Sequence, residues 1–185
     1  MNAMYFQVPQ SRQRLIWLGA REGLIIEPGH PSVQNRPCSV RAAWNDIANP
    51  EDELIYAFDA IAKRRNSIAP ILAKAVPGQQ LSKLEPRGFY YNWQRLPWDG
   101  PAMTIPKEDI NICHPVEQRI ITPTECKRLM AFPDGFRLVG NIQERRYRVG
   151  NSVPPLFMRA IAQHIRRTIL DERLTGMGLE ARLTE

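Results

Sequence analysis

Three features that often reveal the class of a protein are scarce in this sequence: cysteines, lysines and long apolar runs. The cysteines, Cys38, Cys113 and Cys126, are odd in number and lack the spacing of a metal site. They argue against a disulfide framework and fit a reducing cytoplasm. No run is long enough to span a membrane, and the first residues lack the layout of a signal peptide. We therefore expect a cytoplasmic protein with neither a metal site nor a membrane partner.

Lysine is scarce relative to arginine, because 5 lysines stand against 20 arginines in a chain of formal net charge +6. The planar fork of arginine suits phosphate groups and base edges, so the bias favours a nucleic-acid partner. Genome composition alone can also enrich arginine. The length of 185 residues allows one domain or two small ones.

Helical spacing is clearest in two places in the first half of the chain. Ser39 is placed as an N-cap, and apolar residues share one face from 40 to 47. Residues 53–65 repeat the pattern and end in three cations, which fit a solvated helix end as well as a phosphate clamp. Prolines then recur from 70 to 106, which predicts irregular loops and short strands.

In the second half, Thr122 and Glu125 form the pattern of a capping box, with Pro123 at the first helical position. Residues 134–152 are expected to be a loop. A final helix is expected from Pro155 to about residue 170, followed by a frayed tail.

The opening stretch looks like part of an active site. Gln10, Arg12 and Arg14 alternate, so in an extended backbone their side chains point to one side. Apolar residues follow from 15 to 18. The pattern predicts a strand that delivers two guanidinium groups to one face of a site.

Three separated segments resemble the C-terminal half of a DNA cytosine-5 methyltransferase. "VPQSRQRLIWLG" (8–19) resembles motif VIII of that family, and the residues before it, "MNAMYFQVPQ", resemble the family's "LNAADYGVPQ". "RIITPTECKRLMAFPDGF" (119–136) resembles motif IX, and "YRVGNSVPPLFMRAIAQHI" (147–165) resembles motif X. The family places its target recognition domain between motifs VIII and IX.

The resemblance implies an α+β fold: a small mixed target recognition domain, with terminal segments that complete the Rossmann-like S-adenosylmethionine-dependent methyltransferase domain of a partner. The expected divisions are a motif VIII strand segment (1–27), a linker and recognition domain (28–118), a motif IX and X segment that returns to the catalytic domain (119–170), and the tail (171–185).

Three parts of the family's active site do not occur in these 185 residues: the glycine-rich donor-binding loop, the Pro-Cys-Gln nucleophile and the Glu-Asn-Val glutamate. Cys38 follows a proline but precedes a serine, so a buried structural cysteine is expected there. "GMGLEA" (176–181) has no strand before it and reads as chance. The resemblance thus implies the recognition subunit of a split enzyme, active only with a catalytic subunit that supplies these parts.

For the chemistry, the resemblance makes Arg14 the contact to the flipped cytosine, which gathers negative charge on its O2 and N3 side when it is attacked. Arg12 would assist near the same base or its phosphates, and Gln10 would brace the loop. The plainer alternative is a pair of surface arginines on an edge strand.

For the cofactor, S-adenosylmethionine, the matching residues are Asn151, Ser152 and Val153, as one wall of a pocket that a partner completes. Double-stranded DNA would be contacted through a longer set, which is Arg87, Asn92, Arg95, Thr104, Ile105, Arg145 and Arg146. Aromatic residues among the first of these are expected to be mostly core, and the arginines before motif X fit a solvated loop equally well.

Two alternatives to the split enzyme remain open: a stand-alone DNA-binding or regulatory protein, and a truncated inactive fragment. The split-enzyme hypothesis fits a prokaryotic or phage source and a role in restriction-modification. The split-subunit hypothesis predicts an exposed apolar patch made of Leu15, Trp17, Ile161 and Ile165, because these would face the missing sheet.

Overall fold

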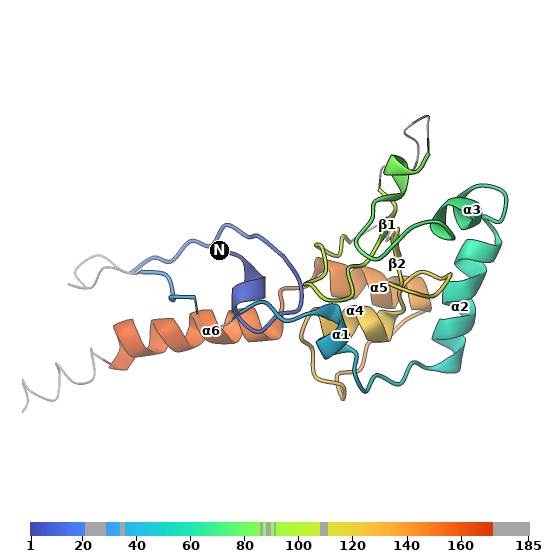
Figure 1. The fold of residues 1–185 in the computed structure, drawn as a ribbon. Helices are drawn as coiled ribbons and strands as arrows, with labels where there is room; N and C mark the ends of the chain where they lie inside the picture. The colour runs from blue at the N-terminus through green and yellow to red at the C-terminus, as the bar shows by residue number, and fades with distance from the viewer. Residues whose placement is uncertain are drawn as a thin grey trace, which may run out of the picture.

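The protein is described by a computed structural model over residues 1–20, 29–33, 36–85, 87, 90, 92–107 and 111–171. Helices dominate it, with one small parallel sheet (Figure 1). In chain order the elements are η1 Ala3–Tyr5, α1 Val40–Ala43, α2 Glu51–Ala62, α3 Ile68–Leu72, η2 Leu81–Lys83, β1 Gln94–Arg95, β2 Ile112–Cys113, α4 Pro123–Leu129, α5 Ile142–Asn151, α6 Pro155–Ile165 and the π-helical η3 Arg166–Asp171.

The molecule has two unequal parts. In Figure 1 the N-terminal segment lies along α6 on one side, and α1 to α5 surround the strand pair on the other. Phe6 and Val8 pack with Phe157 and Ile161 in a core cluster of their own, so the two ends of the described chain meet. The larger part has two further clusters, one of which includes Trp44.

The sheet is smaller than an α+β prediction suggests. β1 pairs with β2 in parallel, with Gln94 opposite Ile112. The expected motif VIII strand is not a regular strand. Residues 9–14 are instead held by isolated bridges, antiparallel between Asn2 and Gln13 and parallel between Gln10 and Ala102. Each bridge joins a single pair of residues, so the segment does not form a regular ladder.

The loop expected over 134–152 was wrong, because α5 occupies its second half. Asn141 caps the helix and forms a capping box with Glu144. The signal was missed because α5 is strongly polar and only Arg146, Val149 and Gly150 of it are buried. Packing of that narrow stripe against the larger core adds to the capping box in holding the helix, since most helical stability in proteins comes from tertiary packing.

Other local predictions are confirmed. The Ser39 hydroxyl accepts a hydrogen bond from the Ala42 amide, and the Thr122–Glu125 capping box forms with Pro123 in the first turn. α6 begins at Pro155 as expected. Arg119 is buried and pairs with Glu125 through two hydrogen bonds of 2.8 and 2.7 Å, so motif IX is a structural element here.

The predicted apolar patch is only half right. Leu15 and Trp17 are 78% and 85% exposed. Ile161, however, is 2% exposed because it packs in the cluster of the N-terminal segment, and Ile165 is partly buried there. The N-terminal segment therefore covers the face of α6 that the sequence assigned to a partner. In the described part of the chain, no helix has the length and apolar character needed to cross a bilayer.

Candidate functional site

Arg12 is the centre of the candidate site, because its guanidinium joins three segments that are far apart in sequence. Nη1 donates to the Ile105 carbonyl at 2.9 Å, and Nη2 donates to the Gly150 and Ser152 carbonyls at 2.8 and 3.2 Å. The residue is 3% exposed. Burial, and then the charge of Arg14, lower the pKa of Arg12 to about 10, so it stays charged at neutral pH. The segment that carries Arg12, the segment at Ile105 and the turn that ends α5 are thus held together.

Gln10 extends this fastening to α4. Its Oε1 accepts hydrogen bonds from Arg12 Nη1 and from the Ile105 amide, both at 3.3 Å. Its Nε2 donates to the Leu129 carbonyl at 3.4 Å, and the side chain is fully buried. Every polar atom of the amide group therefore has a hydrogen-bond partner. Through these bonds Gln10 holds its own segment against Ile105 and α4.

Arg14 behaves differently from Arg12, since it is exposed to solvent. Its backbone amide donates to the Met1 carbonyl at 2.9 Å, and its Nη1 donates to the Gln13 carbonyl at 2.6 Å. With Asn2 and Leu15 it lines an open hollow of about 450 Å³. The structure thus fixes the backbone of Arg14 while leaving its guanidinium accessible.

The motif X turn sits directly beside Arg12. A Cβ atom added to Gly150 would lie 2.0 Å from the Pro106 carbonyl oxygen, so only glycine allows α5 to approach that backbone. The next residue, Asn151, is exposed, and Val153 is 48% exposed. Ser152 donates its hydroxyl to the Val149 carbonyl at 2.6 Å. An accessible amide and an apolar side chain fit one wall of an S-adenosylmethionine pocket, but not a whole pocket.

Two of the residues expected to contact DNA share a groove of about 260 Å³. Asn92 and Thr104 line it, together with Gln94 and Asn111. Thr104 Oγ1 donates to the Ser11 carbonyl at 2.8 Å, which places the groove next to the motif VIII segment. Amide side chains suit the reading of base edges, adenine above all. Asn111 lacks any motif signal in the sequence, so only the fold adds it to this set.

Three other residues of the expected DNA-contacting set are buried. Arg95 is 2% exposed and donates to the Leu72 and His114 carbonyls at 2.8 and 3.0 Å. Ile105 is fully buried and Arg146 is 6% exposed. Their burial counts against direct DNA contact, because each is packed inside the larger part of the molecule.

The remaining two arginines of the set are at the surface. Arg87 is exposed and pairs with Glu85 at 2.8 Å. Arg145 is partly buried, donates to the Gly140 carbonyl at 2.9 Å and lies 3.5 Å from a Glu53 carboxylate oxygen. Arg145 therefore belongs to a helix that packs near α2 and not to the solvated loop that the sequence suggested.

The cysteines of the described residues do not have the environment of a nucleophile. Burial raises the pKa of both Cys113 and Cys126 to about 12, and it also raises the pKa of Cys38. A reactive cysteine needs a lowered pKa and access to its substrate. These three thiols stay protonated at neutral pH.

The fold is similar to part of a solved structure. A solved structure, described as a DNA modification methyltransferase encoded in an Escherichia coli prophage, superposes with a TM-score of 0.66 over 91% of this chain and 59% of its own, at 20% identity. At that identity the likeness concerns the fold alone.

The sequence comparison gives the family. The model of the C-5 cytosine-specific DNA methylases matches residues 1–167, so the chain belongs to that family. The type II methyltransferase M.Eco47II of Escherichia coli is 27% identical over 89% of this chain and 44% of its own length. M.AgeI of Thalassovita gelatinovora is 36% identical over 50% of this chain and 23% of its own. The chain thus spans less than half of these relatives.

Proposed function

We propose that this chain is the target-recognition half of a DNA cytosine-5 methyltransferase and works as the recognition subunit of a split enzyme. The observation that supports this most is the Arg12 clamp. It ties the segment carrying Arg14, the recognition groove beside Ile105 and the motif X turn into one unit. A protein that only bound DNA would gain nothing from coupling its groove to a base-activating arginine and a donor-pocket asparagine.

In this proposal Arg14 acts on the flipped cytosine. Its guanidinium is accessible while its backbone is fixed by Met1, which is the combination needed to place a charge accurately. A fixed cation beside O2 and N3 stabilises the negative charge that develops when C6 is attacked in a water-poor pocket. Arg12 contributes by positioning this segment from within the protein.

The family implies dependence on S-adenosylmethionine, which supplies the methyl group, and DNA as the substrate. Asn151, Ser152 and Val153 would form one wall of the donor pocket. The glycine-rich loop, the nucleophilic cysteine and the glutamate would come from a catalytic subunit. The exposed Leu15 and Trp17, next to Arg14, are apolar surface of the kind that a partner covers.

The test is methyl transfer from labelled S-adenosylmethionine to mixed-sequence DNA. The full chain is assayed alone and with a polypeptide that carries the three missing parts. Transfer is expected only in the mixture, and mapping the methylated cytosines gives the target sequence. Absence of transfer in the mixture, with DNA still retained in a gel shift, would contradict the proposal in favour of a stand-alone DNA-binding protein.

Arg14→Ala tests the assigned chemistry in the same mixture. Transfer should be abolished while DNA binding is largely kept, because the variant removes a charge that acts on the reacting base. Arg137→Ala is the matched control, since Arg137 is exposed and lies outside the site. Equal loss of transfer and of DNA binding in Arg14→Ala would refute the role given to Arg14.

A further inference from the structure

The outer side of α2 carries an exposed apolar stripe. Ile55 and Phe58 are 57% and 45% exposed, and Ala62, one turn further on, is exposed as well. These three residues, which we call the α2 stripe, are three and four positions apart, so they project from one side of the helix. A helix in a globular protein usually buries its apolar side, and among the residues that the structure describes nothing covers this one.

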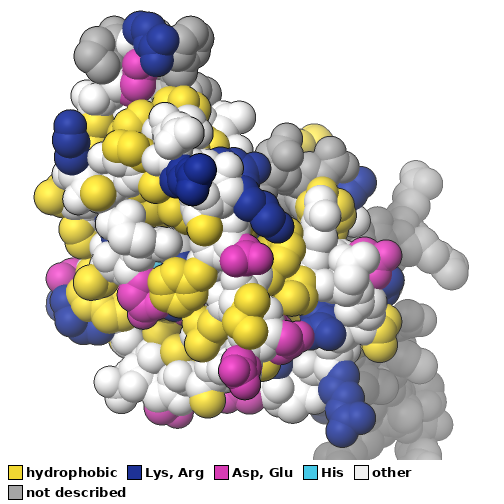
Figure 2. Space-filling view, turned by 90° about the vertical axis from the view of Figure 1, so that its right-hand side faces the viewer, with side chains coloured by type: hydrophobic (Ala, Val, Ile, Leu, Met, Phe, Trp, Pro, Cys, Tyr) yellow, Lys and Arg dark blue, Asp and Glu magenta, His cyan; other side chains and the backbone are white. Residues whose placement is uncertain are grey.

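Charges of opposite sign lie at the two ends of the α2 stripe. Glu51 begins α2, and Arg65 lies in the turn after it, where the Arg65 amide donates to the Ala62 carbonyl at 3.2 Å. Both charged side chains are exposed, and neither forms an ion pair within the described ranges. Figure 2 shows this side of the molecule, with Lys and Arg side chains in its upper middle and hydrophobic and acidic side chains lower down.

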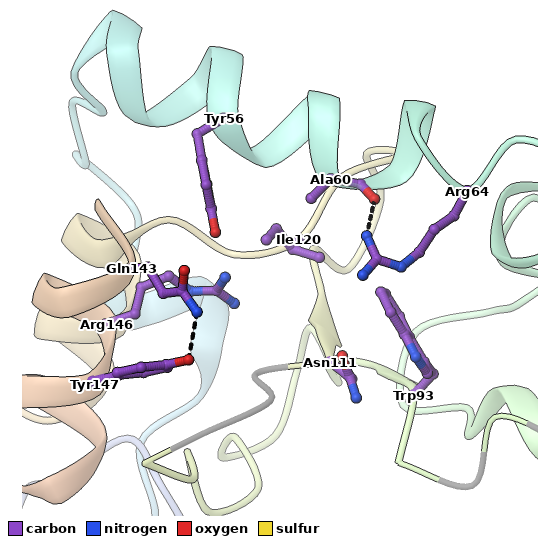
Figure 3. A pocket seen from close by; sticks show the side chains of 9 residues that line it. All are labelled: Tyr56, Ala60, Arg64, Trp93, Asn111, Ile120, Gln143, Arg146 and Tyr147. Carbon is purple, nitrogen blue, oxygen red and sulfur yellow. Dashed lines mark hydrogen bonds between the residues drawn. The ribbon is translucent and has the colours of Figure 1, made fainter. Parts of the chain in front are cut away.

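The other sides of α2 are already packed against the protein. Tyr56, Ala60 and Arg64 line a small pocket between α2 and α5 (Figure 3). Ala57 and Ile61 are buried in a core cluster. The α2 stripe is therefore turned away from the rest of the fold. In Figure 1, α2 lies at the edge of the molecule, on the far side from α6 and the N-terminal segment.

This arrangement is complementary to itself. When two copies of a helix pack antiparallel about a two-fold axis, a residue before the axis meets the residue that lies equally far after it. Glu51 and Arg65 are each seven positions from Phe58, which is about two helical turns. With Phe58 at the axis, Glu51 of each copy therefore meets Arg65 of the other, and Ile55 packs near Ala62. A nucleic acid strand, by contrast, would suit only the basic end and would be repelled at Glu51.

We propose that α2 pairs antiparallel with α2 of a second copy of this chain, through the α2 stripe and an ion pair at each end. One helix pair buries less surface than the roughly 1,200–2,000 Å² of a standard interface, so the dimer is weak, with a dissociation constant of about 10–100 µM. This surface goes beyond the function proposed above and does not depend on it. The segment that carries Arg14 lies on the other side of the molecule and stays accessible in the dimer (Figure 1).

Sedimentation equilibrium of the full chain, from about 5 to about 300 µM in about 0.05 M salt, tests the dimer. The chain should be mostly monomeric at the lowest concentration and mostly dimeric at the highest. Arg65→Glu should raise the dissociation constant about tenfold, because it sets like charges against each other at both ends. Glu51→Arg should do the same, and the double variant Glu51→Arg/Arg65→Glu should restore the dimer. Lys63→Glu is the matched control, since Lys63 is exposed but lies off the α2 stripe, and it should change the constant less than about twofold.

Poor folding of the variants cannot imitate this pattern. Both charge changes oppose the helix dipole, so α2 is least stable in the double variant, in which the dimer should return. Phe58→Ser removes the exposed ring at the axis and should abolish the dimer over the same range of concentration.

A chain that stays monomeric at about 300 µM, or a double variant as weak as the single ones, would overturn the proposal. A dimer lost in Trp17→Ser and kept in Phe58→Ser would place the contact at the exposed Leu15 and Trp17 and would refute it too. Equal loss of DNA retention in Lys63→Glu and Arg65→Glu, in a chain that forms no dimer, would assign the basic end of α2 to nucleic acid instead. The readout is the mass of this chain alone, so its failure is distinct from failure of methyl transfer.

Discussion

Removing the Arg12 clamp should loosen the whole site, and the size of the effect can be worked out from its contacts. Arg12→Met keeps most of the side-chain stem and deletes the guanidinium. Three backbone carbonyls, those of Ile105, Gly150 and Ser152, then lose a charged donor. A hydrogen bond from a charged group contributes about 1.5–3 kcal/mol, and such bonds within one network do not add fully.

Burying the Arg12 guanidinium also costs free energy. Its Nε has no hydrogen-bond partner among the described residues, and burial disfavours its charge, as the lowered pKa of about 10 records. These costs offset part of the gain. We expect Arg12→Met to lower the free energy of unfolding by about 3 kcal/mol, a large part of the 5–15 kcal/mol that is typical of a domain. Arg12→Lys should recover only part of the loss, because an ammonium cannot span the carbonyls of Ile105 and Gly150 as a fork does.

Urea denaturation of the full chain, followed by circular dichroism, measures the difference. Hydrogen exchange then locates it: the amides of the motif X turn and of residues 102–105 should lose protection together. A loss below about 1 kcal/mol in Arg12→Met, or full stability in Arg12→Lys, would show that the carbonyl contacts do not hold the three segments.

Three further predictions concern single positions. Gly150→Ala should destabilise the protein by at least about 2 kcal/mol in urea denaturation, because the new Cβ meets the Pro106 carbonyl; unchanged stability would contradict the close approach. Gln7 has a φ of 61°, so Gln7→Gly should raise the free energy of unfolding by up to about 1 kcal/mol, measured as a higher urea midpoint, and a lower midpoint would argue against strain there. Burial lowers the pKa of His114 from 6.5 to about 4, so the unfolded chain binds the extra proton between these values. Stability should therefore fall by up to roughly 3 kcal/mol as pH drops from 6.5 to 4, and His114→Gln should flatten that slope; an equal slope in the variant would refute the assignment.

Much of this protein was determined locally by its sequence. The capping box at Thr122 formed as predicted, because its hydrogen bonds join residues three apart and need no tertiary partner. α6 was predictable for a similar reason, since its apolar spacing matches one helical face. The family was also readable from three ordered segments that resemble its motifs, and the family model matches residues 1–167.

The tertiary structure decided the surroundings of the arginines. Arg12 and Arg14 are two residues apart in one motif, yet the first is buried under three carbonyls and the second is exposed. Arg95 was expected at the DNA and lies in the core, where it donates to loop carbonyls. An arginine side chain can be buried with its guanidinium hydrogen-bonded to carbonyls, or it can extend into solvent. The residue type alone therefore does not predict whether an arginine is buried.

The tertiary structure also decided the formation of α5 and the backbone conformation of Gln7. The helix has too few apolar residues to be recognised, and its stability comes from the close packing of Gly150 and Val149 against chain that is distant in sequence. Gln7 takes a left-handed backbone conformation at the position where the related motif has glycine. Local preference opposes the backbone conformation of Gln7, which persists because contacts made by the rest of the fold outweigh that preference.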